Sequence, residues 1–129
     1  MTPFGYAHAG GDDWHDVVAE VIDQLGSASG NLGFLYVTDA VNPHLDEILE
    51  RLRDATGVEH WVGAVGIGIC ATGVEYYGRP AIAVMLGVFP DDAFRVFPSI
   101  VKGLDGFDAL SRGWLGSAQP YLGLIHADP

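Results

Sequence analysis

Residues 61–86 read Trp-Val-Gly-Ala-Val-Gly-Ile-Gly-Ile-Cys-Ala-Thr-Gly-Val-Glu-Tyr-Tyr-Gly-Arg-Pro-Ala-Ile-Ala-Val-Met-Leu. In this stretch an apolar run of the kind found in strands breaks into glycines and then resumes. We expect two buried strands, at 58–65 and 81–88, around a glycine-lined turn. Because glycine has no side chain, the backbone amides of this turn can closely approach a neighbouring strand or a small anionic ligand. The turn is therefore the best candidate for a site.

The connection between these two strands is short, which favours antiparallel pairing of one with the other, with the glycines as bulges or points of close approach. The pattern Gly66-x-Gly68-x-x-Ala71 has the form of a dinucleotide fingerprint. Residues 72–80, however, leave no room for the helix whose N-terminus would receive the pyrophosphate. We therefore expect no dinucleotide, and the sequence implies no other cofactor.

Two segments have the spacing of main amphipathic helices. Apolar residues recur at helical intervals over 13–25 and over 43–55. Residues 102–119 suggest loops with a short helix. The expected capping residues are Asp12 or Asp13 for the first helix, and Asn42, followed by Pro43 at the first helical position, and Gly57 for the second.

Three further segments have the character of strands. Continuous apolar runs at 32–37 and 120–126 are typical of buried strands, and alternation at 94–97 favours a short, half-buried one. Together these patterns predict an α/β or α+β fold. We expect a mixed, largely antiparallel sheet of about five strands with the two main helices packed on it. The length of 129 residues fits a single domain, 1–129.

The charge balance restricts the partners. The chain has 17 Asp and Glu but only 6 Lys and Arg, a formal net charge of -11. Such a surface repels polyphosphate backbones and anionic lipid, so we expect neither nucleic acid nor a membrane as a partner. A lone cysteine cannot form an internal disulfide, and the N-terminus lacks the basic start and apolar run of a secretory signal. The expected location is the cytoplasm.

Polar residues gather around the glycine turn. Arg79 is suited to pairing with a ligand carboxylate and Glu75 to pairing with an ammonium group, which are the two charges of an amino acid. The structural alternative is that Glu75 and Arg79 bridge each other while the neighbouring tyrosines pack on the sheet. The predicted ligand-binding residues are Gly66, Gly68, Cys70, Thr72, Gly73, Glu75 and Arg79.

Cys70 also carries an alternative hypothesis, in which its thiol is the nucleophile of a hydrolase. No histidine can be assigned to it from spacing, and the apolar neighbours Ile69 and Ala71 favour a buried cysteine that fills the core. The five histidines lack the short paired spacings of metal ligands, so we expect no metal site. They are His8, His15, His44, His60 and His126.

The order of these motifs resembles the N-terminal domain of FIST proteins over residues 6–97. The similar segments are Tyr6-Ala7-His8-Ala9, Asp13-Trp14, 31–37, Trp61-Val62-Gly63, Gly73-Val74-Glu75 and 80–84. The family pattern places a glycine after an apolar strand and ends in Gly-x-Glu, which Gly73 and Glu75 match. Gly63, Gly66 and Gly68 are alternatives for the first glycine.

The resemblance implies an intracellular sensory domain that binds a small ligand, for example an amino acid, and relays a signal to other domains without turnover. It also implies a C-terminal FIST domain that is missing from this chain, so we expect residues 1–129 to be the N-terminal part of a longer protein. The alternatives are the Cys70 hydrolase and a structural or assembly module that binds no ligand. We further expect self-association through an exposed sheet edge or apolar face.

Overall fold

The computed structural model describes residues 4–127, and the chain divides into two compact units. The first unit is Met1–Val88 and the second is Phe89–Pro129. None of the helices within residues 4–127 combines the length and the apolar content that crossing a bilayer requires.

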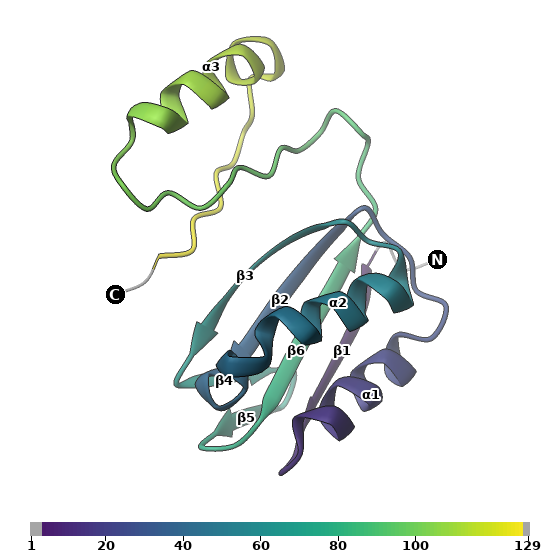
Figure 1. Ribbon diagram of the computed structural model, residues 1–129. Helices are drawn as coiled ribbons and strands as arrows, with labels where there is room; N and C mark the ends of the chain where they lie inside the picture. Colours follow the sequence, from purple (N-terminus) through teal and green to yellow (C-terminus); the bar gives the residue numbers. More distant parts are fainter. Residues whose placement is uncertain (1–3, 128–129) are drawn as a thin grey trace. The chain divides into compact units, whose positions relative to one another are not determined.

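The first unit alternates strands and helices before a run of strands (Figure 1). In chain order its elements are β1 (Phe4–Gly10), α1 (Trp14–Leu25), β2 (Leu32–Thr38), the 3-10 helix η1 (Asp39–His44), α2 (Leu45–Thr56), β3 (His60–Gly66), β4 (Gly68–Ala71), β5 (Val74–Tyr77) and β6 (Ala81–Gly87). Within residues 4–88, four strands form one sheet in the order β1-β6-β2-β3, and β4 pairs with β5 in a separate hairpin. The predicted fold class is confirmed.

The sheet is mixed because only one neighbouring pair is parallel. β2 and β3 run parallel and are joined by η1 and α2, as a crossover connection requires. β6 lies between β1 and β2 and is antiparallel to both. The predicted pairing of the strands at 58–65 and 81–88 with each other is therefore wrong, since β2 separates β3 from β6.

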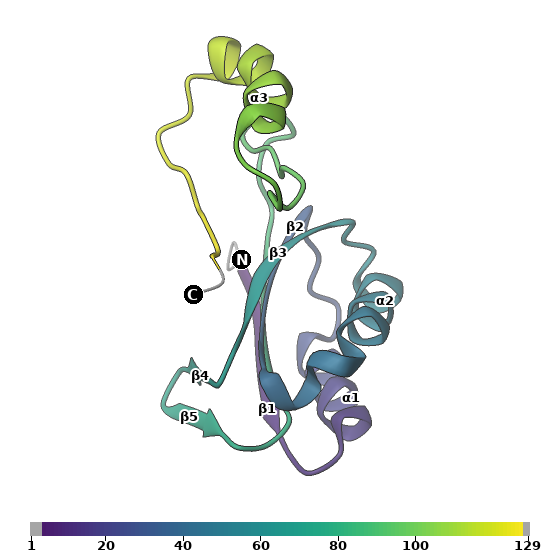
Figure 2. The same ribbon diagram turned by 60° about the vertical axis from the view of Figure 1, so that its left-hand side comes forward.

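Both helices lie on one face of the sheet (Figure 2). Apolar side chains of α1 and α2 meet the inward residues of β1, β2 and β6 and form the main core. The Asp13 side chain caps α1 by accepting a hydrogen bond from the backbone N–H of His15, which confirms one of the two predicted caps. Gly57 ends α2 in the left-handed conformation with φ 70°, as predicted.

The predicted start of the second helix is wrong. Asn42 and Pro43 lie inside η1, and α2 begins at Leu45. Pro43 lies inside the 3-10 turn, and after it the Leu45 N–H donates to the carbonyl of Asn42 in the i→i−3 pattern of such a turn. Thus the proline precedes the α-helix instead of opening it.

The hairpin β4-β5 covers part of the other face of the sheet (Figure 2). Ile69 and Tyr76 pack on Ala81 and Ala83 of β6 and form a second, smaller core there. The hairpin thus covers the first part of β6, at Ala81 and Ala83, on the face opposite the helices, and every residue of β6 except Met85 is buried, which confirms the buried strand predicted at 81–88. The glycine turn of the sequence thus contains a pair of strands that was not predicted.

β3 is an edge strand and is only half-buried, so the prediction of a buried strand at 58–65 is wrong in this respect. It approaches β2 closely at Gly63, where an added Cβ would overlap the carbonyl oxygen of Leu35. This bears out the expectation that a glycine of this stretch permits close backbone approach.

β1 was not predicted, because its sequence Phe-Gly-Tyr-Ala-His-Ala-Gly has no β-branched residue and carries two glycines. In the second unit the helix α3 (Asp105–Ala118) spans 14 residues and is longer than the short helix expected. Residues 94–97 and 120–126 form no strand, so both predicted strands are wrong. Neither segment has a neighbouring strand that would take up its backbone hydrogen bonds.

Candidate functional site

The predicted site residues fall in or beside the hairpin β4-β5. A two-residue turn, Thr72-Gly73, joins the strands, since Ala71 pairs with Val74. Gly73 has φ 78°, and an added Cβ there would meet no atom within 4 Å. Positive φ at the second central residue alone is the pattern of a type II turn, which explains the glycine at this position. Gly66 lies at the end of β3, just before the hairpin.

Three of the predicted residues lie on the outer face of the hairpin, which points away from the sheet. Cys70 is paired in register with Glu75, and both side chains are exposed. Gly68 is paired with Tyr77, whose ring occupies the space beside the glycine. The outer face therefore presents one thiol and one carboxylate with an aromatic ring at its end.

Two other predicted residues connect to the side where the hairpin meets the sheet. The guanidinium of Arg79 lies over the ring of Tyr76, 5.6 Å from its centroid. The backbone N–H of Thr72 donates to the hydroxyl of Tyr6 on β1, over an N···O distance of 2.8 Å. Within residues 4–127 no ion pair joins Glu75 to Arg79, so the predicted bridge between them is absent. The hairpin separates the predicted residues onto two sides.

Two polar residues of this region were not predicted. Tyr6 and His8 alternate along β1 and face the hairpin, and the Nδ1 atom of His8 lies 2.8 Å from the hydroxyl of Tyr76. The His8 ring lies between two tyrosine rings, with its centroid 5.5 Å from that of Tyr6 and 5.9 Å from that of Tyr76. The period-two spacing of Tyr6 and His8 is the sequence signal that could have placed them on one face.

Cys70 is exposed, so the interpretation of this residue as a buried core filler is wrong. The reason is its position on the outer face of β4, where alternation buries Ile69 and turns the next side chain to solvent. Within the part of the chain that the structure describes, the thiol has no histidine or other base within hydrogen-bond distance. The arrangement lacks the activating base that a cysteine nucleophile needs.

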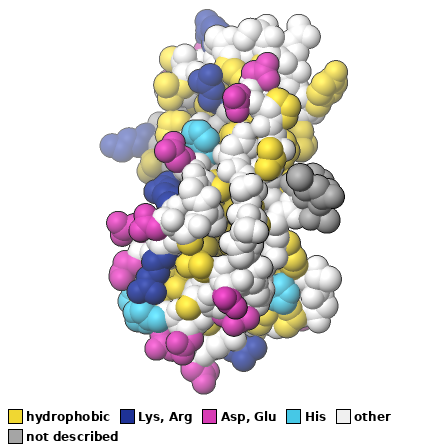
Figure 3. Space-filling view, turned by 90° about the vertical axis from the view of Figure 1, so that its right-hand side faces the viewer, with side chains coloured by type: hydrophobic (Ala, Val, Ile, Leu, Met, Phe, Trp, Pro, Cys, Tyr) yellow, Lys and Arg dark blue, Asp and Glu magenta, His cyan; other side chains and the backbone are white. Residues whose placement is uncertain are grey.

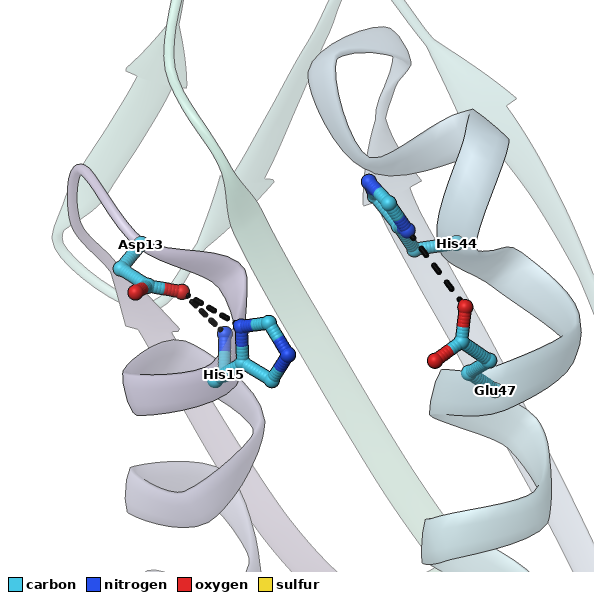
Figure 4. Close-up of polar contacts among 4 residues, drawn as sticks. All are labelled: Asp13, His15, His44 and Glu47. Carbon is cyan, nitrogen blue, oxygen red and sulfur yellow. Dashed lines mark hydrogen bonds and ion pairs between the residues drawn. The ribbon is translucent and has the colours of Figure 1, made fainter.

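Two other histidines, His15 and His44, lie near the starts of α1 and α2, each beside a carboxylate (Figure 4). The rings of His15 and His44 stack on Trp14, at centroid distances of 3.8 and 4.8 Å. Asp13 contacts His15, and Glu47 lies 3.6 Å from His44. The hydrogen bond from the His15 backbone N–H, followed by that of its ring, holds the pKa of Asp13 below its ordinary value.

Among residues 4–127 no three His, Cys, Asp or Glu side chains gather in a way that could hold a metal ion. Two surface hollows lie in the second unit and are lined by none of the predicted site residues. The first, of about 250 Å³, lies between the segment 98–103 and the start of α3, and the second is lined by Asp92, Ala93 and residues of α3.

The charges of the first unit are unevenly distributed. Most of the exposed Asp and Glu residues lie on α1 and α2 or next to them, and in Figure 3 acidic side chains gather on the side of these helices. In the hairpin Glu75 is the one Asp or Glu among residues 68–77. An anionic ligand is therefore repelled less on the hairpin side of the sheet than on the helix side.

A model of a protein family, the FIST N domain, matches residues 31–129 of the chain. The match covers well over half of the sequence and includes β2, β3, the hairpin, β6 and the whole second unit. It extends beyond residue 97, where the resemblance seen in the sequence ended, and it begins after β1 and α1. No curated protein matches the chain.

Proposed function

This chain belongs to the FIST N domain family, and on that premise we propose that it is a sensory domain that binds a small ligand at the hairpin β4-β5. Domains of this family are in general sensory domains of signal transduction. The observation that carries the proposal is the hairpin itself, which holds its glycine turn against β1 by the hydrogen bond between Thr72 and Tyr6.

The proposed ligand site comprises the residues predicted from the sequence. Gly73 leaves the backbone of the turn accessible, Gly66 and Gly68 lie before it on the approach to the hairpin, and Cys70, Thr72, Glu75 and Arg79 supply the polar groups. The open space around Gly73 supports this proposal, because a ligand can reach the backbone of the turn without displacing a side chain.

An amino acid is the first ligand class to test, with Arg79 for its carboxylate and Glu75 for its ammonium group. Ligand binding at the turn would restrain the two-residue connection between β4 and β5. A shift in the conformations of the hairpin would then signal the bound state to a C-terminal FIST domain or another partner. A cytoplasmic location, argued from the lone cysteine, is part of the same proposal.

Thermal shift and isothermal titration against amino acids and other small metabolites test the proposal. A ligand present at about 100 times its Kd stabilises the folded state by about 2.7 kcal/mol. We expect Glu75→Gln and Arg79→Gln to weaken binding, whereas Arg53→Gln on the exposed side of α2 leaves it unchanged. If no metabolite shifts the melting temperature of the full-length protein, the sensory proposal is wrong.

A structural or assembly role is the second candidate, and one observation favours it. The ring of Tyr77 occupies the space beside Gly68, so part of the glycine run is filled by the protein itself. The edge strand β3 carries no Lys, Arg, Asp or Glu to discourage pairing with another strand. A concentration-dependent dimer in sedimentation, together with no ligand response, would support this role over the first.

A further inference from the structure

A row of side chains beside the hairpin, on the sheet face opposite the helices, is partly exposed. Strand register places Tyr6, Met85, Phe34 and Val62 next to one another across all four strands. None of these four side chains is buried, and Tyr6 is 44% exposed. The next row, which includes His8 and Ala83, lies at the hairpin. We call the row of Tyr6, Met85, Phe34 and Val62 the apolar shelf; the hairpin lies along one edge of it.

Hydrogen-bond donors lie where the shelf meets the hairpin. The Tyr6 hydroxyl accepts the N–H of Thr72, so its own proton is available to an acceptor outside the protein. When the Tyr76 hydroxyl donates to Nδ1 of His8, the imidazole proton is on Nε2. No residue in the described range 4–127 accepts a hydrogen bond from that nitrogen. With the imidazole in that tautomer, both groups can donate a hydrogen bond to an oxyanion.

The shelf has no carboxylate that could pair with a cationic group of a ligand. The shelf and the row next to it contain no Asp or Glu, as the register shows. Glu75 lies on the outer face of the hairpin, opposite the side on which Tyr76 packs against the sheet. A ligand ammonium group placed near Tyr6 would therefore lose its hydration without gaining a carboxylate partner.

We propose that the shelf binds a small carboxylic acid with an apolar body and no ammonium group. The carboxylate accepts hydrogen bonds from Tyr6 and His8, and the apolar body lies on Met85, Phe34 and Val62. This inference rests on the proposed function, because it names a ligand class and a binding surface for the same sensory domain. It differs from the sequence expectation in making Glu75 unnecessary.

Isothermal titration of the full chain with matched acids tests the inference. The two pairs are 4-methylpentanoate with leucine, and 3-phenylpropanoate with phenylalanine. We expect the acid without the amino group to bind at least about tenfold more tightly in each pair, because hydrogen bonds to a charged group are retained while the ammonium cost is avoided.

Substitutions on the shelf and on the outer face of the hairpin test where the acid binds. Tyr6→Phe removes the donor and should weaken the acid about tenfold, whereas Tyr77→Phe, on the outer face, should not. Met85→Glu places a carboxylate on the shelf and should abolish binding, whereas the isosteric Met85→Gln should retain most of it. Melting temperatures of all four variants establish that each is folded.

The outcomes separate this inference from the proposed function. Tighter binding of the amino acids, lost in Glu75→Gln and kept in Tyr6→Phe, overturns the inference and leaves the sensory role intact. Binding of neither class, nor of any other metabolite, overturns both. A dimer that Met85→Glu dissociates, with no acid bound, shows that a second copy occupies the shelf and overturns the inference.

Discussion

The two units of the chain contain similar apolar runs but bury them very differently. The run 81–87 in β6 packs against the helices on one face and, at Ala81 and Ala83, against the hairpin on the other, and Ile82, Val84 and Leu86 are at most 2% exposed. The run 120–126 in the second unit has no facing layer, and Tyr121, Leu122 and Ile125 are more than 80% exposed. An apolar pattern thus becomes a strand only where other elements supply both hydrogen bonds and cover.

The same contrast holds over the whole of each unit. Every member of the two apolar cores belongs to the first unit. Among residues 89–127 the one buried side chain is that of Ser111. We therefore expect substitutions in the first unit to cost far more stability than matched substitutions in the second.

The largest effect is expected at Gly63. In Gly63→Ala the new methyl group overlaps the Leu35 carbonyl of β2, and a paired strand cannot move away without breaking the sheet. We expect a loss of at least about 3 kcal/mol or failure to fold, measured by urea denaturation and circular dichroism.

The matched control is Gly113→Ala in α3, where the added Cβ meets no atom within 4 Å. We expect no loss, and a gain of up to about 1 kcal/mol in local helix stability, because alanine is the better helix former. Equal losses of unfolding free energy in Gly63→Ala and Gly113→Ala would contradict the proposed difference in packing between the two units.

Local patterns predicted much of the first unit. α1 with its Asp13 cap, the Gly57 end of α2, and the strands at 32–37 and 81–88 follow from spacing and capping within a few residues. The order of strands does not, because β6 inserts between β1 and β2 from far along the chain. Since no local signal reports which strands are neighbours, the pairing of 58–65 with 81–88 was wrong.

The candidate site was likewise predicted only where local sequence patterns determine it. The hairpin residues were found from the glycine run, but the contacts of Tyr6 with Thr72 and of His8 with Tyr76 join residues 66 and 68 positions apart. The exposure of Cys70 followed from a register that the sequence did not reveal, since the hairpin itself was taken for a turn. Long-range pairing decides which side chains meet.

The next largest difference in stability between the two units is expected from truncating an apolar side chain in each. Leu86→Ala removes a fully buried side chain of β6 and should cost about 2–5 kcal/mol, because a cavity remains between the sheet and the helices. Leu122→Ala removes a side chain that is 83% exposed and should cost less than about 0.5 kcal/mol. Urea denaturation of both variants measures the difference, and a cost above 1 kcal/mol at Leu122 would mean that this segment is buried in solution.

Hydroxyl groups provide a smaller and more specific comparison. Thr38 is fully buried; its Oγ1 donates to the carbonyl of Arg79 and accepts from the N–H of Ala81. Thr38→Val leaves both backbone groups unpaired and should cost about 1–3 kcal/mol.

Ser117 of α3 is the exposed counterpart, since its hydroxyl contacts the carbonyls of Gly113 and Trp114 within the helix. Those carbonyls can turn to water, so Ser117→Ala should be close to neutral in the same denaturation assay. A similar cost at the two positions would show that burial of the hydroxyl is not what makes Thr38 important.

The smallest effect concerns the helix caps and pH. Asp13 caps α1, whereas Leu104 at the start of α3 offers no side-chain cap. Because the pKa of Asp13 is lowered in the folded state, its contribution to stability is present above the unfolded pKa and is lost as pH falls through the folded one. Asp13→Asn keeps an oxygen acceptor without this titration. The melting temperature of the wild-type chain should therefore approach that of Asp13→Asn between pH 5 and about pH 2, and a constant difference over that interval would show that the His15 hydrogen bonds do not bias the carboxylate.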